Sequence, residues 1–224
     1  MKGVVFSLKN HSSVKNNRHI KISLSDVRYF LKRYGVIATF VCLLFVGVAV
    51  GSIYAQNSEK SLFDSLDFLF TTNFDVRLAQ NMAETFCACF ASDFIFLLTV
   101  FLLGLAPWGI CAMPFVVFFR GFGTGLTAGY LIMTYSFKGV GFYLLILLPG
   151  TFLFCMALIL LLTSAFYTSK RMFLFTISKY TPKSSLWQDV KDFCSRSMSV
   201  LIMTFCSAVL DAVLWTLFAE GFNF

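Results

Sequence analysis

Residues 118–131 read FFRGFGTGLTAGYL, and this stretch decides how the chain has to fold. Gly121, Gly125 and Gly129 recur every four residues, so on a helix they lie nearly in line on one face. Small residues at this spacing let a second helix approach closely, as in pairs of membrane helices. A phosphate-binding loop is disfavoured, because no strand precedes these glycines and the lysine that would hold a nucleotide is missing. We therefore expect the three glycines to pack helices.

The rest of the chain indicates that lipid is its solvent. Of the 224 residues, 58% are hydrophobic and only 13% are charged, whereas soluble domains carry about a quarter charged residues. Five apolar runs are long enough to cross about 30 Å of hydrocarbon at about 1.5 Å per residue. They cover residues 34–55, 85–105, 110–135, 142–164 and 198–218. The predicted fold class is all-α, a polytopic membrane bundle of about five transmembrane helices.

Two of these runs contain interruptions. Pro114, Arg120 and the glycines interrupt the third run, so we expect that helix to be broken or partly re-entrant. The sequence leaves open whether residues 107–119 cross the membrane or re-enter. In the fourth run, Pro149 and Gly150 predict a kink, because proline removes a backbone donor and glycine relaxes the helix.

Charge is distributed unevenly and predicts the topology. Lys and Arg cluster in residues 1–33 and 165–196, whereas residues 56–84 hold five acids against two basic residues. Short loops rich in Lys and Arg stay on the cytoplasmic side. We expect a single transmembrane domain over residues 34–218, with segment 1–33 a basic cytoplasmic tail that ends in an amphipathic helix. Segment 56–84 is then an extracytoplasmic loop, 165–196 a cytoplasmic loop with short interfacial helices, and 219–224 an extracytoplasmic C-terminus.

The predicted outer loop contains an amphipathic stretch, SLFDSLDFLF, at residues 61–70. Its apolar side chains share one helical face, opposite Asp64. They are Leu62, Phe63, Leu66, Leu69 and Phe70. We expect this face to lie on the outer membrane surface or to cover the bundle.

Three charged residues fall inside the predicted spans. An arginine at the centre of a span costs on the order of 2.5 to 3.5 kcal/mol on insertion scales, so Arg120 needs an acidic partner or a wet cavity. Alternatively, Arg120 lies near an interface and its side chain reaches lipid phosphate. Asp93 follows Ser92 and can cap a helix that begins there, whereas Asp211 has no such explanation. An intramembrane acid serves architecture or the movement of protons or ions, and both interpretations stay open.

Patterns of catalysis and cofactor binding are not found. No Ser/His/Asp set and no HExxH motif occurs outside the predicted spans. The seven cysteines include no CxxC pair, and both histidines lie in the polar N-terminal tail, so we expect no metal site. The basic tail lacks the aromatic-basic motif of a nucleic-acid reader. The sequence predicts no enzyme, no cofactor and no nucleic-acid partner; membrane lipid is the expected surrounding.

Taken in order, these motifs resemble the stage II sporulation protein M family of integral membrane proteins. FFRGFGTGLTAGYL is similar to the family's helix with a basic residue followed by three glycines four residues apart. LLILLPG at 144–150 matches a leucine-proline step in the family's next span. SAVLDAVL at 207–214 stands where the family has an acidic residue in its last span. The resemblance runs from about residue 33 to residue 218.

The resemblance implies a non-catalytic subunit of the bacterial cell membrane. In endospore formers such a subunit anchors stage II sporulation proteins D and P, the peptidoglycan-degrading machinery of engulfment, and the apolar face of the outer loop would dock these cell-wall hydrolases. Some family members sit beside transporter components, so the alternative is a permease-like subunit that works with a cytoplasmic ATPase. In that interpretation Arg120, Pro149, Gly150 and Asp211 line a path, and residues 165–196 meet the ATPase.

Overall fold

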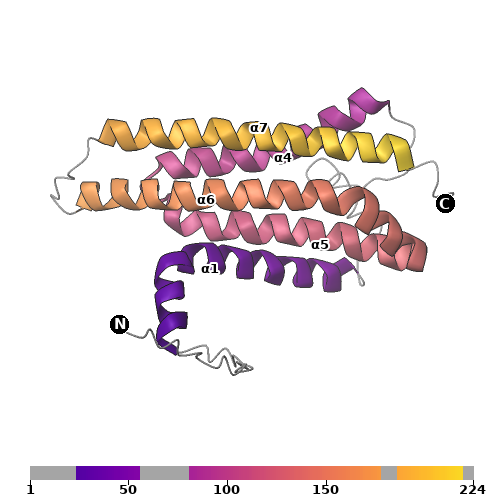
Figure 1. Ribbon diagram of the computed structural model, residues 1–224, viewed down its shortest axis with the longest axis horizontal. Helices are drawn as coiled ribbons and strands as arrows, with labels where there is room; N and C mark the ends of the chain where they lie inside the picture. Colours follow the sequence, from indigo (N-terminus) through magenta and orange to yellow (C-terminus); the bar gives the residue numbers. More distant parts are fainter. Residues whose placement is uncertain (1–23, 56–80, 178–185, 219–224) are drawn as a thin grey trace, which may run out of the picture. The chain divides into compact units, whose positions relative to one another are not determined.

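A computed structural model of the protein describes residues 24–55, 81–177 and 186–218 (Figure 1). The chain divides into two units, Met1–Gly35 and Val36–Phe224. Helix α1 (Leu24–Ala55) begins in the first unit and continues into the second. All contacts described below lie within the second unit.

The described part of the second unit is helical apart from short connections, and it contains no strand. After α1 come α4 (Met82–Leu105), α5 (Gly109–Phe142), the π-helical turn η1 (Tyr143–Leu147), α6 (Leu148–Ile177) and α7 (Leu186–Phe218). Five helical stretches among these described residues are long and apolar enough to cross a membrane. The predicted all-α bundle of membrane-spanning helices is confirmed.

The ends of α4 follow from local chemistry. The backbone N–H of Asn81 donates to the carboxylate of Glu84 at 3.1 Å, which satisfies one of the unpaired groups at the start of the helix. After Leu105 the chain turns at once into α5, and the N–H of Gly109 donates to the Ala106 carbonyl at 3.1 Å. A Cβ on Gly109 would overlap the Leu103 carbonyl, so this tight turn requires glycine.

The helices pack around a main apolar core, with two smaller apolar clusters beside it. Helices α4, α6 and α7 pack against one another, α5 packs against α4 and α6, and successive helices alternate in direction (Figure 1). Val100, Val117, Phe154, Leu161 and Leu162, from α4, α5 and α6, are fully buried at the centre. Large apolar side chains also cover the outside, as a lipid environment allows. Helix association in lipid must therefore rely on close packing and polar contacts.

The predicted break in the third span lies elsewhere in the structure. Helix α5 runs without interruption through Pro114 and Arg120, so no re-entrant segment occurs over residues 107–119. Pro114 is the sixth residue of α5, so its missing N–H removes one hydrogen bond to the carbonyl four residues earlier, yet the helix continues through it. The interruption falls at Ser136, whose φ of 49° and ψ of −127° are non-helical, and there the chain enters the next span.

The fourth and fifth helices are longer than predicted. The helical stretch Ser136–Ile177 has 42 residues, or about 63 Å at 1.5 Å per residue, twice the thickness of the hydrocarbon. The loop and separate interfacial helices expected over 165–196 are mostly the last turns of α6 and the first turns of α7. No proline or glycine occurs from residue 151 until Pro182, so nothing in the sequence stops α6 where its apolar run ends.

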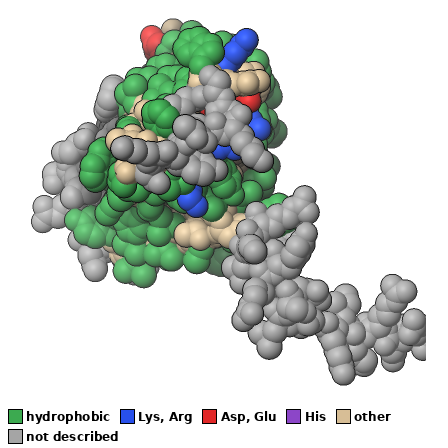
Figure 2. Space-filling view, turned by 90° about the vertical axis from the view of Figure 1, so that its left-hand side faces the viewer, with side chains coloured by type: hydrophobic (Ala, Val, Ile, Leu, Met, Phe, Trp, Pro, Cys, Tyr) green, Lys and Arg blue, Asp and Glu red, His purple; other side chains and the backbone are tan. Residues whose placement is uncertain are grey.

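The extended ends of α6 and α7 carry a cluster of exposed charges. Figure 2 looks at the end of the bundle where α6 ends and α7 begins, and Lys, Arg and acidic side chains gather there. They include Lys170, Arg171, Lys191, Asp192 and Arg196, all of which are exposed. We call this the basic end of the bundle.

Candidate functional site

Glycines bring α1 and α5 into contact. A Cβ on Gly129 would lie 2.7 Å from the Ala55 Cβ, and one on Gly125 would lie 2.7 Å from the Val48 carbonyl carbon. A Cβ on Gly121 would overlap the Leu44 carbonyl oxygen. Real side chains do not approach this closely, so the three glycines let the backbones of the two helices touch.

Two glycines on α1 complete this contact, and the sequence analysis did not single them out. A Cβ on Gly47 would lie 2.5 Å from the Phe118 carbonyl oxygen, and one on Gly51 would lie 3.0 Å from the Leu126 backbone nitrogen. Both glycines belong to the motif GVAVG at residues 47–51. Its spacing of four residues was the signal that would have identified them.

Arg120 and Asp93 form a buried ion pair between α5 and α4. The Arg120 Nη2 donates to Asp93 Oδ1 at 2.7 Å, and the two side chains are 8% and 6% exposed. Asp93 lies well inside α4, which begins at Met82, so Asp93 caps no helix. The burial of Arg120 also places it away from the surface position that the snorkelling alternative requires.

Aromatic rings hold the guanidinium in place. The Arg120 Cζ lies 4.4 Å from the centre of the Phe154 ring and 5.2 Å from that of the Phe96 ring. Both rings are buried, and cation–π attraction strengthens when water is absent. Helices α4, α5 and α6 therefore all contribute to the surroundings of this one charge.

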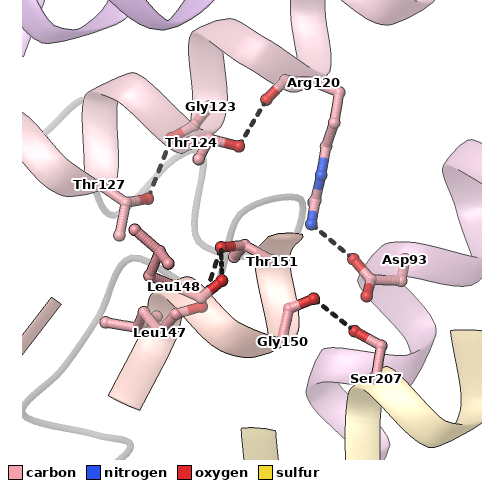
Figure 3. Close-up of polar contacts among 10 residues, drawn as sticks. All are labelled: Asp93, Arg120, Gly123, Thr124, Thr127, Leu147, Leu148, Gly150, Thr151 and Ser207. Atoms are coloured by element: carbon pink, nitrogen blue, oxygen red, sulfur yellow. Dashed lines mark hydrogen bonds and ion pairs between the residues drawn. The ribbon is translucent and has the colours of Figure 1, made fainter. Parts of the chain in front are cut away.

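A polar cavity of about 40 Å³ lies beside the ion pair. It is lined by Cys89, Ser92 and Asp93 of α4, Arg120, Gly123, Thr124 and Thr127 of α5, Tyr143 and Leu147 of η1, Thr151 of α6 and Asp211 of α7. Figure 3 shows the ion pair and the threonines of this lining. The cavity lining brings together Arg120, Asp93 and Asp211, which the sequence analysis placed on three separate spans.

Three threonines of the lining bond in the same way (Figure 3). The hydroxyls of Thr124 and Thr127 donate to the carbonyls of Arg120 and Gly123, each at 3.0 Å. The Thr151 hydroxyl donates to the Leu147 carbonyl at 2.9 Å. A hydroxyl has one proton and two lone pairs, so each of these threonines keeps only hydrogen-bond acceptor capacity.

Asp211 contacts α6 at Gly150. A Cβ on Gly150 would lie 2.6 Å from Asp211 Oδ2, so only glycine leaves room for this carboxylate. One turn earlier on α7, the Ser207 hydroxyl donates to the Gly150 carbonyl at 2.7 Å. The glycine after the proline is thus the point at which α6 and α7 meet through polar groups.

The irregularity predicted at Pro149 and Gly150 takes the form of a π-helical turn. Residues Tyr143–Leu147 form this turn, which ends two residues before Pro149, and the N–H of Leu148 donates to the Tyr143 carbonyl five residues back. Such wide turns accommodate a proline, which has no N–H to donate, and they turn side chains to new directions. Here the turn supplies Tyr143 and Leu147 to the cavity lining.

A second, larger cavity of about 160 Å³ lies at the basic end between α6 and α7. Arg171 and Asp189 form an ion pair at its margin, and the Arg171 side chain is 57% exposed. Asp192 and Arg196 also line it. The sequence analysis missed this cavity because it treated residues 165–196 as a loop, which hides the helical spacing of these charges.

The structure does not describe the apolar face predicted to dock partners. Leu62, Phe63, Leu66, Leu69 and Phe70 lie outside the described residues.

These features define a class: an α-helical, multi-pass membrane protein with a buried ion pair at the centre of its bundle. Comparison with known protein families matches residues 38–215 to stage II sporulation protein M. Because this match covers most of the chain, the protein belongs to the stage II sporulation protein M family. Neither the curated proteins nor the solved structures gave a significant match.

Proposed function

We propose that the protein is a non-catalytic scaffold in a bacterial cell membrane that anchors a peptidoglycan-degrading complex. The family's name ties it to the second stage of sporulation. The resemblance of its motifs extends this to cell-wall hydrolases, with stage II sporulation proteins D and P as the partners in an endospore former.

The size of the central cavity carries the proposal. Its volume is about 40 Å³, whereas pockets that bind small-molecule ligands are typically about 300–1,000 Å³. The ion pair between Arg120 and Asp93 ties two helices beside it, and the glycine contacts leave α1 and α5 no space between them. A bundle locked in this way suits a fixed anchor better than a passage for a solute.

The orientation follows from charge. Lys170, Arg171, Lys191 and Arg196 are exposed at the basic end, which therefore faces the cytoplasm. Helix α1 ends and α4 begins at the other end of the bundle (Figure 1). In this orientation the N-terminal segment is cytoplasmic, and the segment between α1 and α4 faces the extracytoplasmic partners.

The test is affinity purification of the tagged full-length protein from native membranes in mild detergent, followed by mass spectrometry. We expect hydrolases with extracytoplasmic domains to be enriched, and to be lost when Leu66 and Leu69 are both changed to Asn. The control Trp187→Gln removes a side chain that is 76% exposed near the basic end, and it should retain these partners. Recovery of the same hydrolases from the Leu66→Asn/Leu69→Asn variant would contradict the docking face.

A second candidate is a permease-like subunit that works with a cytoplasmic ATPase. The cavity at the basic end favours it, because Arg171, Asp189, Asp192 and Arg196 offer charges of both signs to a protein on the cytoplasmic side. In the same purification this candidate predicts recovery of an ATP-binding subunit. Arg171→Glu combined with Arg196→Glu should remove that subunit and leave any hydrolase in place.

A further inference from the structure

We propose that the cavity at the basic end, between α6 and α7, binds the headgroup of a phospholipid that carries both a phosphate and a primary ammonium, as phosphatidylethanolamine does. The phosphate binds Arg171 and Arg196, and the ammonium binds Asp192. The proposal does not depend on the scaffold function, because it concerns only the lining of this cavity and the helix surface beside it.

The cavity lies at the level where lipid headgroups are found. Its lining residues fall between positions 164 and 196, directly between the apolar runs 142–164 and 198–218. Trp108 lies at the same end of the bundle, where its ring is 6.2 Å from that of Phe173 on α6, and it is 76% exposed. Exposed tryptophans are typical of the boundary between hydrocarbon and water. Polar pockets between membrane helices at the cytoplasmic boundary are places where lipid headgroups bind.

The charges of the lining are balanced. Among the described lining residues, Arg171 and Arg196 are positive, and Asp189 and Asp192 are negative (Figure 2). A headgroup with only a negative charge would meet two carboxylates, and a simple cation would meet two guanidinium groups. A headgroup that carries one charge of each sign can place each charge beside its opposite. The lining therefore favours a zwitterionic lipid over an anionic one.

The side chains have the donors and acceptors that this headgroup needs. Arg171 uses Nη1 for its ion pair with Asp189, but a guanidinium has five N–H donors, and this side chain is 57% exposed. Arginine binds phosphate oxygens through paired hydrogen bonds. Arg196 and Asp192 are exposed and lie one turn apart on α7. A primary ammonium has three N–H donors for a carboxylate, whereas the quaternary ammonium of a choline headgroup has none.

The helix surface beside the cavity accommodates the acyl chains. Met156 and Leu160 of α6 are 48% and 50% exposed. At a spacing of four residues they continue the helix face that carries Ser164 and Thr168 of the cavity lining. One water needs on the order of 10–15 Å³, so about 160 Å³ holds a headgroup but not a whole lipid. The headgroup therefore occupies the cavity while its chains lie along the apolar face toward the middle of the bundle.

The experiment uses the purified full-length protein in detergent micelles. The micelles contain equal amounts of phosphatidylethanolamine, phosphatidylglycerol and phosphatidylcholine with identical acyl chains, and native mass spectrometry counts the lipids that stay bound. We expect one phosphatidylethanolamine to be retained in preference to the other two lipids. Arg196→Gln should lower its retention by about tenfold, because the phosphate loses a charge-assisted hydrogen bond.

A second variant tests how the cavity selects its lipid. Asp192→Asn leaves the described lining with one excess positive charge, so the preference should move from phosphatidylethanolamine to the anionic phosphatidylglycerol. The matched controls are Lys170→Gln and Lys191→Gln. Each removes an exposed cation adjacent in sequence to a lining residue, and neither lysine is among the described residues that line the cavity. Both controls should keep the preference of the wild-type protein.

The proposal is overturned if the wild-type protein retains the three lipids equally or prefers phosphatidylglycerol. Retention of phosphatidylcholine as strongly as phosphatidylethanolamine would refute the contact between Asp192 and the ammonium. If a variant does not fold, the comparison of the three lipids on the wild-type protein decides alone. An ATP-binding subunit that Arg196→Gln removes from native membranes, with lipid retention unchanged, would assign the cavity to a protein partner and overturn the lipid site.

Discussion

Arg120 on α5 donates a 2.7 Å hydrogen bond to Asp93 on α4, 27 residues earlier in the chain, and both side chains are buried. In hydrocarbon no water solvates either charge. Any arrangement of α4 and α5 that separates Arg120 from Asp93 therefore leaves two uncompensated charges. The pair therefore selects which faces of the two helices meet.

Removing one partner of this pair should be strongly destabilising. Arg120→Met and Asp93→Leu each leave one buried charge unpaired, and we expect each to lower the free energy of unfolding by about 3–5 kcal/mol. The double variant should lose much less than the sum of the two. Unfolding in mixed micelles with increasing denaturing detergent measures all three.

The exposed pair at the basic end is the control for that experiment. Arg171 is 57% exposed, so Arg171→Gln should change stability by less than about 1 kcal/mol. Equal losses from Arg120→Met and Arg171→Gln would contradict a special role for the buried pair.

Gly125→Leu should force α1 and α5 apart. A Cβ at this position would already lie 2.7 Å from the Val48 carbonyl carbon, and overpacking of this kind typically costs about 1–3 kcal/mol or more. The matched control is Gly35→Leu, because a Cβ on Gly35 meets nothing within 4 Å. Abundance in membranes and the Tm in detergent should fall for Gly125→Leu only. An unchanged Tm for Gly125→Leu argues against backbone contact between the helices.

Gly150 and Asp211 should be energetically coupled. Gly150→Ala puts a Cβ into the Asp211 carboxylate, so we expect a loss of about 1–3 kcal/mol in the wild-type background. In an Asp211→Ala background the same substitution should cost little, because the methyl group then has room. A double-mutant cycle measured by thermal unfolding gives the coupling directly. Additive effects of the two substitutions would show that the contact is not made.

Cysteine labelling tests the orientation. After removal of the seven native cysteines, Ser58→Cys should react with a membrane-impermeant thiol reagent in intact cells and Ser184→Cys should not. Permeabilised cells provide the control, since both positions should then be labelled. The reverse pattern in intact cells would place the N-terminus outside.

The membrane fold was predictable because its signals are local. Each span is a run of apolar residues, and in lipid the backbone of such a run can satisfy its hydrogen bonds only as a helix. The glycine spacing of α5 was equally visible, since Gly121, Gly125 and Gly129 line one face of any helix. Both inferences need only residues within one span.

The helix limits were predicted less well, for a physical reason. Hydropathy detects the part of a helix that lies in hydrocarbon, whereas a helix ends where its backbone bonding stops. Helix α6 therefore continues to Ile177, past the end of its apolar run, and α5 is interrupted at Ser136 and not at Pro114. Ser136 has a positive φ, which is uncommon for a residue other than glycine, and the apolar pattern of the sequence does not indicate it.

By itself the sequence determined that the protein is a helical membrane bundle of the stage II sporulation protein M family, and it placed Arg120, Asp93 and Asp211 within the predicted spans. Only the tertiary structure decided that Arg120 pairs with Asp93 and that Asp211 contacts Gly150 and shares their cavity. A buried charge requires a compensating group, but the sequence does not identify that group. The partner depends on which helix faces meet, and the faces that meet around this cavity come from five separate elements.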